Sequence, residues 1–150
     1  MPRPPKDAFQ HAVALLSRRE RTAAALKTAL LSKGHSPEDV DAALLRAQQL
    51  GYLDDARVAA ARARKELPQG RSRADVARRL AAQGVSEDVA ETAAEEAAQE
   101  LAHDDEAAAR ALIAKRRLTG VKAARLLAAR GFEEDLIRRV TGLDEASGDG

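Results

Sequence analysis

Residues 33–39 read Lys33-Gly34-His35-Ser36-Pro37-Glu38-Asp39, a segment that ends one helix and begins the next. Glycine closes a helix in the left-handed conformation at little steric cost, and the residue after it is placed for the hydrophobic contact of a Schellman motif. Serine is a favoured N-cap, proline is favoured at the first helical position, and acids in the first turn interact well with the helix dipole. The segment therefore predicts two helices joined by a very short turn.

This pattern recurs twice further along the chain, as Gln83-Gly84-Val85-Ser86-Glu87-Asp88 and as Arg130-Gly131-Phe132-Glu133-Glu134-Asp135. The three glycines are 50 and 47 residues apart. An ungapped alignment of residues 15–34 with residues 112–131 contains five identities in 20 positions, and three further positions keep their chemical type. Self-similarity at a nearly fixed spacing is typical of helical repeat proteins. We therefore predict three copies of one helical unit.

Each copy is expected to contain a further helix before the repeated segment, at residues 9–17, about 55–67 and about 106–115. Apolar residues spaced i,i+4 predict the inward stripe of the helix that follows each glycine. The predicted stripe pairs are Val40/Leu44, Val89/Ala93 and Leu136/Val140. Helices of about 11 residues are marginal alone in water, so the three helices of a unit must pack together.

The composition agrees with many closely packed helices rather than one large core. The chain has 35 alanines among 150 residues and only three aromatic residues. Alanine is the best helix former and fills little core volume. We predict an all-α fold, an elongated tandem array of three three-helix repeats. The expected units are residues 7–53, 54–104 and 105–143, with disordered tails at residues 1–6 and 144–150.

Charge is strongly segregated although the formal net charge is only +1. Residues 57–80 hold eight basic and two acidic side chains, residues 84–107 hold nine acidic side chains and no Lys or Arg, and residues 108–130 hold seven basic side chains and no acid. Most such charges are solvated faces of helices. The basic blocks also form candidate surfaces for a partner of complementary charge.

The inventory of chemical groups argues against an enzyme. The chain has no cysteine, and its three histidines are scattered without metal-binding spacing. There is no Gly-rich phosphate loop and no nucleophile elbow. We therefore expect no catalytic residue, no cofactor and no metal. No apolar run approaches the roughly 18 residues of a membrane span, so we expect a cytoplasmic protein without membrane contact.

A helix–glycine–helix unit also resembles the DNA-binding helix-turn-helix, in which the start of the second helix faces the bases. Here all three second helices begin with acids, which phosphates would repel. We therefore do not expect base-specific reading. Non-specific contact between the basic blocks and a DNA backbone stays open as an alternative.

The most specific string of the chain is Leu50-Gly51-Tyr52-Leu53-Asp54-Asp55-Ala56-Arg57-Val58-Ala59. It resembles the signature of the RecX family, regulators of the RecA recombinase. Leu15-Leu16-Ser17-Arg18-Arg19-Glu20 resembles the first repeat of that family, Gln83-Gly84-Val85-Ser86 the middle repeat, and Ala129-Arg130-Gly131-Phe132 the last. The resemblance covers roughly residues 8–142.

The resemblance implies a non-catalytic regulator that binds RecA, mostly as a filament on single-stranded DNA, and inhibits its ATP hydrolysis and strand exchange during recombination, DNA repair and the SOS response. We expect a monomer, since no long heptad pattern is present. The residues expected to contact the filament are Arg57, Arg62, Arg64, Lys65, Arg71, Arg73, Arg78 and Arg79, with Lys115, Arg116 and Arg117 as a second set. The alternatives are a non-specific DNA-binding protein and a helical scaffold for another partner.

Overall fold

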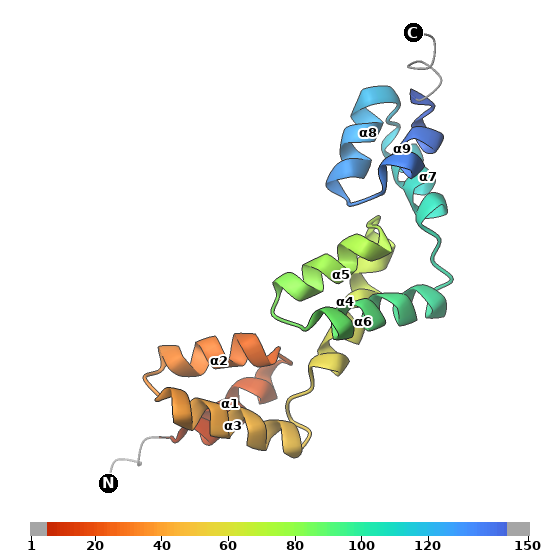
Figure 1. The fold of residues 1–150 in the computed structure, drawn as a ribbon. Helices are drawn as coiled ribbons and strands as arrows, with labels where there is room; N and C mark the ends of the chain where they lie inside the picture. Colours follow the sequence, from red (N-terminus) through yellow and green to blue (C-terminus); the bar gives the residue numbers. More distant parts are fainter. Residues whose placement is uncertain (1–5, 144–150) are drawn as a thin grey trace.

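The computed structural model describes residues 6–143, and the predicted disordered tails lie outside this range except for Lys6. Within it the chain is entirely helical, with nine α-helices, one 3₁₀ turn and no strand (Figure 1). The elements are α1 (Ala8–Arg18), α2 (Ala23–Ser32), α3 (Pro37–Gln49), α4 (Asp55–Glu66), η1 (Leu67–Gln69), α5 (Arg73–Ala82), α6 (Glu87–Glu100), α7 (Asp105–Arg116), α8 (Gly120–Ala129) and α9 (Glu134–Thr141). The predicted all-α class is confirmed.

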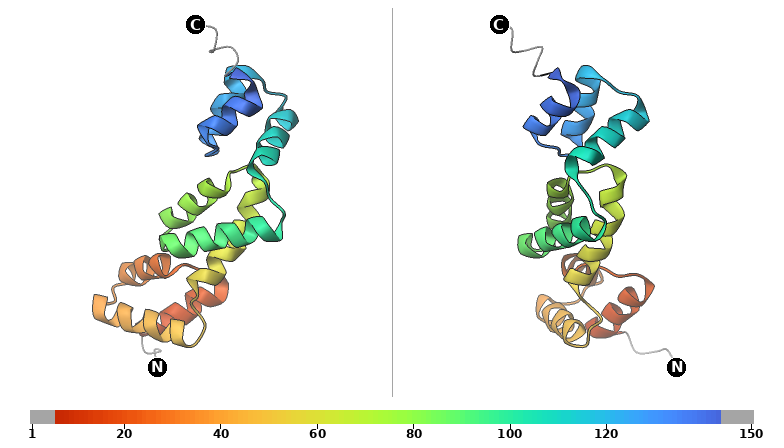
Figure 2. Two further views of the ribbon diagram at one scale, coloured as in Figure 1. Left: turned by 45° about the vertical axis from the view of Figure 1, so that its right-hand side comes forward. Right: turned by 90° about the vertical axis from the view of Figure 1, so that its right-hand side faces the viewer.

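The helices form three units in a row, α1–α3, α4–α6 and α7–α9, and the views in Figures 1 and 2 show the same elongated stack. Every pair of helices with substantial packing belongs to one unit. Each unit also has its own buried cluster, centred on Leu26 and Leu30, on Val76 and Leu80, or on Leu127. The predicted elongated array of three-helix repeats is therefore confirmed.

The turn after the middle helix of each unit is a Schellman motif. The amides of Gly34, Gly84 and Gly131 donate to the carbonyl three residues earlier at 3.0–3.1 Å, and the amide of the following residue donates to the carbonyl five residues earlier at 3.0–3.4 Å. The glycine φ angles are +92°, +96° and +81°, a region that favours glycine. The residue after the glycine is buried in the second and third units, where it is Val85 or Phe132. In the first unit it is His35, which is only partly buried.

The predicted inward stripes are confirmed but incomplete, because all six residues are buried or packed against the core of their unit, and alanine fills much of the remaining interface. In α3 the buried residues are Val40, Ala43 and Ala47, and Leu44 is only partly buried. In α6 Val89 is partly buried, and the buried side chains are all alanines: Ala90, Ala93, Ala94, Ala97 and Ala98. In α9 Leu136 and Ile137 are buried, and Val140 packs against the same cluster while partly buried. Short helices that approach closely favour alanine at the contact, and a stripe drawn from bulky residues misses this.

The three units meet at two contacts, which we call joints. At each joint the N-cap residue of a middle helix forms a hydrogen bond with the next unit. The Thr22 hydroxyl accepts from the Ala25 amide at 3.1 Å and donates to the Gln83 carbonyl of the next unit at 3.3 Å. The Ser72 hydroxyl accepts from the Asp75 amide at 3.0 Å and donates to the Gly131 carbonyl at 2.8 Å. Thr22 and Ser72 are each 1% exposed, so these two side chains are shielded from water.

An aspartate from the next unit completes each joint. The Asp55 carboxylate accepts from the Ala23 amide at 2.8 Å, and the Asp105 carboxylate accepts from the Arg73 amide at 3.0 Å. These amides belong to the first residues of α2 and α5, where helix amides have no partner within the helix. The middle helices of the first two units, α2 and α5, are thus each capped once by their own unit and once by the following unit.

The glycines of the second and third units also permit close approach across the joints. A β-carbon at Gly84 would lie 2.3 Å from the Ala24 β-carbon, and one at Gly131 would lie 2.4 Å from the Asp75 β-carbon. A β-carbon at Gly34 would meet nothing within 4 Å among the described residues. Gly34 is needed only for its backbone conformation, whereas Gly84 and Gly131 are needed for conformation and for space.

Candidate partner-binding surface

The predicted contact residues occupy three places in the array. Four lie on α4, four lie in the segment that leads into and along α5, and three lie at the end of α7 and just after it. These groups are Arg57, Arg62, Arg64 and Lys65, then Arg71, Arg73, Arg78 and Arg79, then Lys115, Arg116 and Arg117. The α4 and α5 groups belong to the second unit, and the α7 group belongs to the third.

Three of the α4 cations are engaged with different neighbours. Arg57 pairs with Glu20 of the first unit and donates to the Gly51 carbonyl at 3.3 Å, so it ties the first two units together. Arg62 donates to the side chain of Gln83, the residue that follows α5, whereas Arg64 pairs with Glu100 of α6 at 2.8 Å. These partners lie in the loop after α1, in the turn after α5 and on α6, so three of the four α4 cations are held by different parts of the array.

Arg71 and Arg78 share one carboxylate beside the second joint. Arg71 lies 2.8 Å and Arg78 lies 3.2 Å from the two oxygens of Asp75. The Asp75 side chain is 14% exposed, and that of Arg71 is 22% exposed. Breaking a half-buried pair leaves a poorly solvated charge behind. Arg71 therefore supports the structure of the joint, whereas Arg78, at 64% exposed, is available to a partner.

Arg130 is a cation that the sequence prediction did not include among the contact residues. Its guanidinium donates to the Gln69 carbonyl at 2.9 Å, across the joint between the second and third units. Partial burial, followed by the charges of Arg116 and Arg71, lowers the pKa of Arg130. These cations come from α7, the loop before α5 and the end of α8. Only the docking of two units brings them together, so local sequence carries no signal for this cluster.

Five predicted cations make no ion pair or side-chain hydrogen bond with any residue in 6–143. They are Lys65, Arg73, Lys115, Arg116 and Arg117, and all five are exposed. The set at the end of α7 also complements the negative end of that helix dipole. The exposed pair of Arg64 with Glu100 costs less than about 1 kcal/mol to break. The accessible charge therefore concentrates on α5 and at the end of α7.

Outside the basic side chains, one histidine of the described range contacts a carboxylate. His103 lies 2.8 Å from the Asp105 carboxylate, which is already used in capping α5. Within residues 6–143, histidine and acidic side chains form no cluster of three that could hold a metal ion. No helix of this part of the chain has the length and apolar character needed to cross a lipid bilayer.

Comparison with known proteins identifies the fold and the lineage of the chain. The family model described as "RecX, first three-helix domain" matches residues 8–46. A regulatory protein RecX of Xanthomonas axonopodis pv. citri is 31% identical over 139 residues, which cover 90% of this chain and 86% of the relative. The chain belongs to the RecX family. Its α1, α2 and most of α3 form the part that the family model recognises.

Other RecX proteins align over shorter or more divergent stretches. The regulatory protein RecX of Syntrophotalea carbinolica is 41% identical over 69 residues, which cover 46% of this chain and 45% of the relative. The crystal structure of RecX from Lactobacillus salivarius has a TM-score of 0.72 at 17% identity and covers 93% of this chain and 94% of its own. A second RecX crystal structure has a TM-score of 0.75 at 19% identity and covers 90% of this chain and 71% of its own. At these identities the crystal structures establish the shared fold.

Proposed function

We propose that this RecX-family chain binds RecA filaments on single-stranded DNA and inhibits their ATP hydrolysis and strand exchange. The observation that carries the proposal is membership of a family of regulatory proteins, given by the alignment along 90% of the chain. The elongated array supports it, because a row of units can contact successive protomers of a filament at once. Several weak contacts made by one molecule add to a strong overall interaction.

The exposed cations at the end of α7 and on α5 are the proposed contact points. Lys115, Arg117 and Arg73 are free of ion pairs with residues 6–143, so a partner's carboxylates or phosphates meet no competing acid on them. Complementary charge at such positions raises the rate of encounter and selects the orientation of docking. Arg57 and Arg71 are assigned to the joints instead, because their contacts link neighbouring units or lie beside the link.

The test is ATP hydrolysis by RecA on single-stranded DNA while this chain is titrated in. We expect inhibition at far less than one molecule per RecA protomer, because blocking the growth of a filament, or promoting its disassembly, affects many protomers. An unchanged rate in the presence of the folded, helical chain contradicts the proposal.

A pair of matched variants tests the contact points. Lys115→Glu/Arg117→Glu reverses two exposed charges of the proposed surface, and Lys122→Glu/Arg125→Glu makes the same change on α8. We expect the first variant to lose about tenfold in inhibitory potency, or about 1.4 kcal/mol, and the second to change it little. Equal losses in the two variants would assign the effect to overall charge rather than to the end of α7.

Direct binding to DNA is the second candidate function, and the cluster of Arg71, Arg116 and Arg130 favours it. The charges of Arg116 and Arg71 help to lower the pKa of Arg130, and such a concentration of positive charge favours a polyanion such as the phosphate backbone. Affinity for bare DNA that falls steeply with salt, together with indifference to RecA, would support this candidate. Tight binding to the RecA filament with weak binding to bare DNA would reject it.

A further inference from the structure

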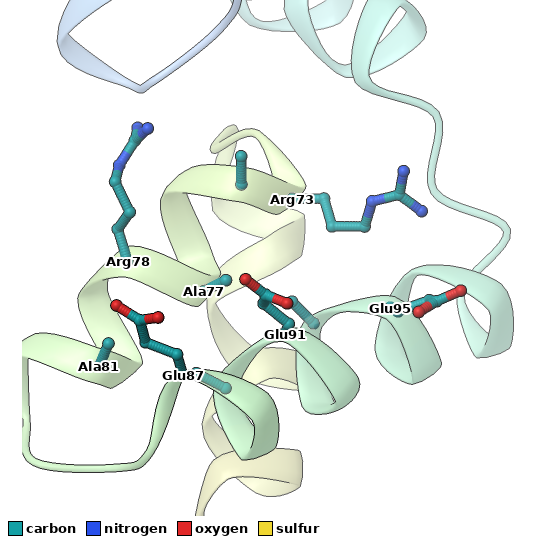
Figure 3. A pocket seen from close by; sticks show the side chains of 10 residues that line it. Arg73, Ala77, Arg78, Ala81, Glu87, Glu91 and Glu95 are labelled. Atoms are coloured by element: carbon teal, nitrogen blue, oxygen red, sulfur yellow. The ribbon is translucent and has the colours of Figure 1, made fainter.

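The second unit has a groove of about 510 Å³ between α5 and α6. Of the cations discussed above, Arg73 and Arg78 border it, on the α5 side only. Five alanines line it: Ala74, Ala77, Ala81, Ala90 and Ala94. Figure 3 shows Arg73 and Arg78 extending from α5, and Glu87, Glu91 and Glu95 following one another along α6. The groove therefore has a floor of small apolar side chains between a basic and an acidic edge.

This groove is particular to the second unit, because bulkier side chains occupy its place in the others. In the first unit the positions of Ala77, Ala81 and Ala94 are taken by Lys27, Leu31 and Leu44. Lys27 also reaches across to Asp41 of α3 at 3.8 Å. In the third unit Ile137 stands at the position of Ala90, and Arg138 at that of Glu91.

The acidic edge is free to pair with an incoming ligand. Glu87, Glu91 and Glu95 are exposed and make no ion pair with any residue in 6–143. Their spacing of four residues places them in a row on one side of α6, over about 12 Å. Three adjacent carboxylates repel phosphates, so this surface does not fit nucleic acid. They fit a partner that presents lysine or arginine side chains at helical spacing.

We propose that this groove receives an α-helix of the partner protein, with a central row of aliphatic side chains and a basic flank that faces Glu87, Glu91 and Glu95. An acidic flank of the same helix faces Arg73 and Arg78. Apolar anchors at i, i+3, i+4 and i+7 are the usual way in which a helix fills such a groove. The proposal rests on the proposed function, in which the partner is a protomer of the RecA filament.

Charge reversal of the acidic edge tests the groove. Glu87→Lys/Glu91→Lys is compared with Asp88→Lys/Glu96→Lys, which makes the same charge change outside the groove on the same helix. Each variant is labelled with a fluorophore at an added terminal cysteine and titrated with RecA filaments on single-stranded DNA. We expect the first variant to bind about tenfold more weakly than the wild type and the control to bind within about twofold.

A second variant fills the groove without changing its charge. Ala81→Leu places at this position the residue that the first unit already carries as Leu31. We expect it to weaken filament binding while the thermal unfolding curve stays close to that of the wild type. If the charge reversal disturbs the fold, Ala81→Leu still tests whether the groove binds the filament.

The outcomes separate the groove from the proposed function. Wild-type affinity in both groove variants, with a wild type that binds the filament, overturns the groove and leaves the function standing. A wild type that does not bind the filament overturns both. A wild-type dimer that the Glu87→Lys/Glu91→Lys variant dissociates, seen by sedimentation velocity, assigns the groove to a second copy and also overturns the proposal.

Discussion

Ala102 adopts a left-handed backbone conformation that glycine adopts at the matching position of the first unit. Its φ angle is +52°, whereas Gly51 has a φ of +80° after α3. The turn is the same, because the amides of Ala102 and His103 donate to Gln99 and Ala98 as those of Gly51 and Tyr52 donate to Gln48 and Ala47. A residue with a β-carbon pays about 1–2 kcal/mol for this conformation.

Ala102→Gly is therefore expected to raise the free energy of unfolding by up to about 1 kcal/mol, after the greater chain entropy of glycine is subtracted. The measurement is urea denaturation followed by far-ultraviolet circular dichroism. Ala111→Gly, at an exposed position within α7, is the control and should cost about 1 kcal/mol. Destabilisation by both substitutions would contradict the strained conformation at Ala102.

A histidine pair makes the first unit sensitive to acid. His11 Nδ1 lies 2.5 Å from His35 Nε2, so one ring must accept the proton of the other. Partial burial, then the charges of His35, Lys33 and Lys6, lower the pKa of His11 below its usual 6.5, against a smaller opposing effect of Asp7. A histidine with a lowered pKa in the folded state binds protons more readily when unfolded.

The contribution of this pair to the free energy of unfolding should be fully present above pH 6.5. It should be lost as the pH falls through the lower, folded-state pKa of His11. The measurement is the thermal midpoint of the chain between pH 7.5 and 5. His11→Gln should flatten the decrease over this range. An equally steep decrease in that variant would assign the acid sensitivity to other groups.

At the scale of single elements, the N-cap residues differ in how many hydrogen bonds they make. Ser36 caps α3 alone, by accepting from the Asp39 amide at 3.2 Å, and it is exposed. Ser72 caps α5 and also donates to the Gly131 carbonyl at 2.8 Å, while almost fully buried. A lost cap costs about 1 kcal/mol, and a buried carbonyl deprived of its donor costs about 1–3 kcal/mol more.

Ser72→Ala is accordingly expected to destabilise the chain by about 2–3 kcal/mol, and Ser36→Ala by about 1 kcal/mol. Chemical denaturation of the two variants provides the comparison. Hydrogen exchange adds the location, because Ser72→Ala should expose amides in α5 and α8 whereas Ser36→Ala should affect α3 alone. Equal losses would show that the second bond of Ser72 contributes nothing.

The elements were predictable from sequence where local chemistry determines them. Gly34, Ser36 and Pro37 define a helix end and a helix start without help from distant residues, and the structure has both. The buried face of α6 was only partly predictable, because Val89 and Ala93 pack inward as expected but close packing against α4 and α5 also buries Ala90 and Ala94. Bulky apolar residues are conspicuous in a sequence, whereas the alanines of a tight contact are not.

The candidate surface was predictable only as a set of charges. Which cations remain free depends on acids far away in the sequence, such as Glu20 for Arg57 and Glu100 for Arg64. Arg130 joins the surface only because the third unit docks on the second. Local spacing cannot supply information of this kind, since a side chain's partner across a joint has no fixed sequence separation.

At the scale of the whole molecule, substitutions at two glycines test whether close contact at a joint fixes the arrangement of the units. Gly84→Ala places a β-carbon 2.3 Å from that of Ala24, whereas Gly34→Ala meets no described atom within 4 Å. Both substitutions incur a similar backbone cost of about 1–2 kcal/mol, because both φ angles are strongly positive. Only the first must also displace α2 from the turn after α5.

We therefore expect Gly84→Ala to alter the scattering profile of the molecule and to destabilise it more than Gly34→Ala does. Small-angle X-ray scattering reports the overall shape, and urea denaturation reports the stability. Unchanged scattering with equal loss of stability in the two variants would mean that the joint tolerates the added methyl group.

The confinement of substantial helix packing to single units has a consequence for the order in which the protein is made. Residues 8–53 contain every side chain of the first buried cluster, so that cluster needs nothing from the later part of the chain. Proteins rich in local contacts fold quickly, and chains are synthesised from the N-terminus. The first unit can thus be complete while the third is still being translated. Each later unit then docks on a finished surface, and the nascent protein lengthens by one folded segment at a time.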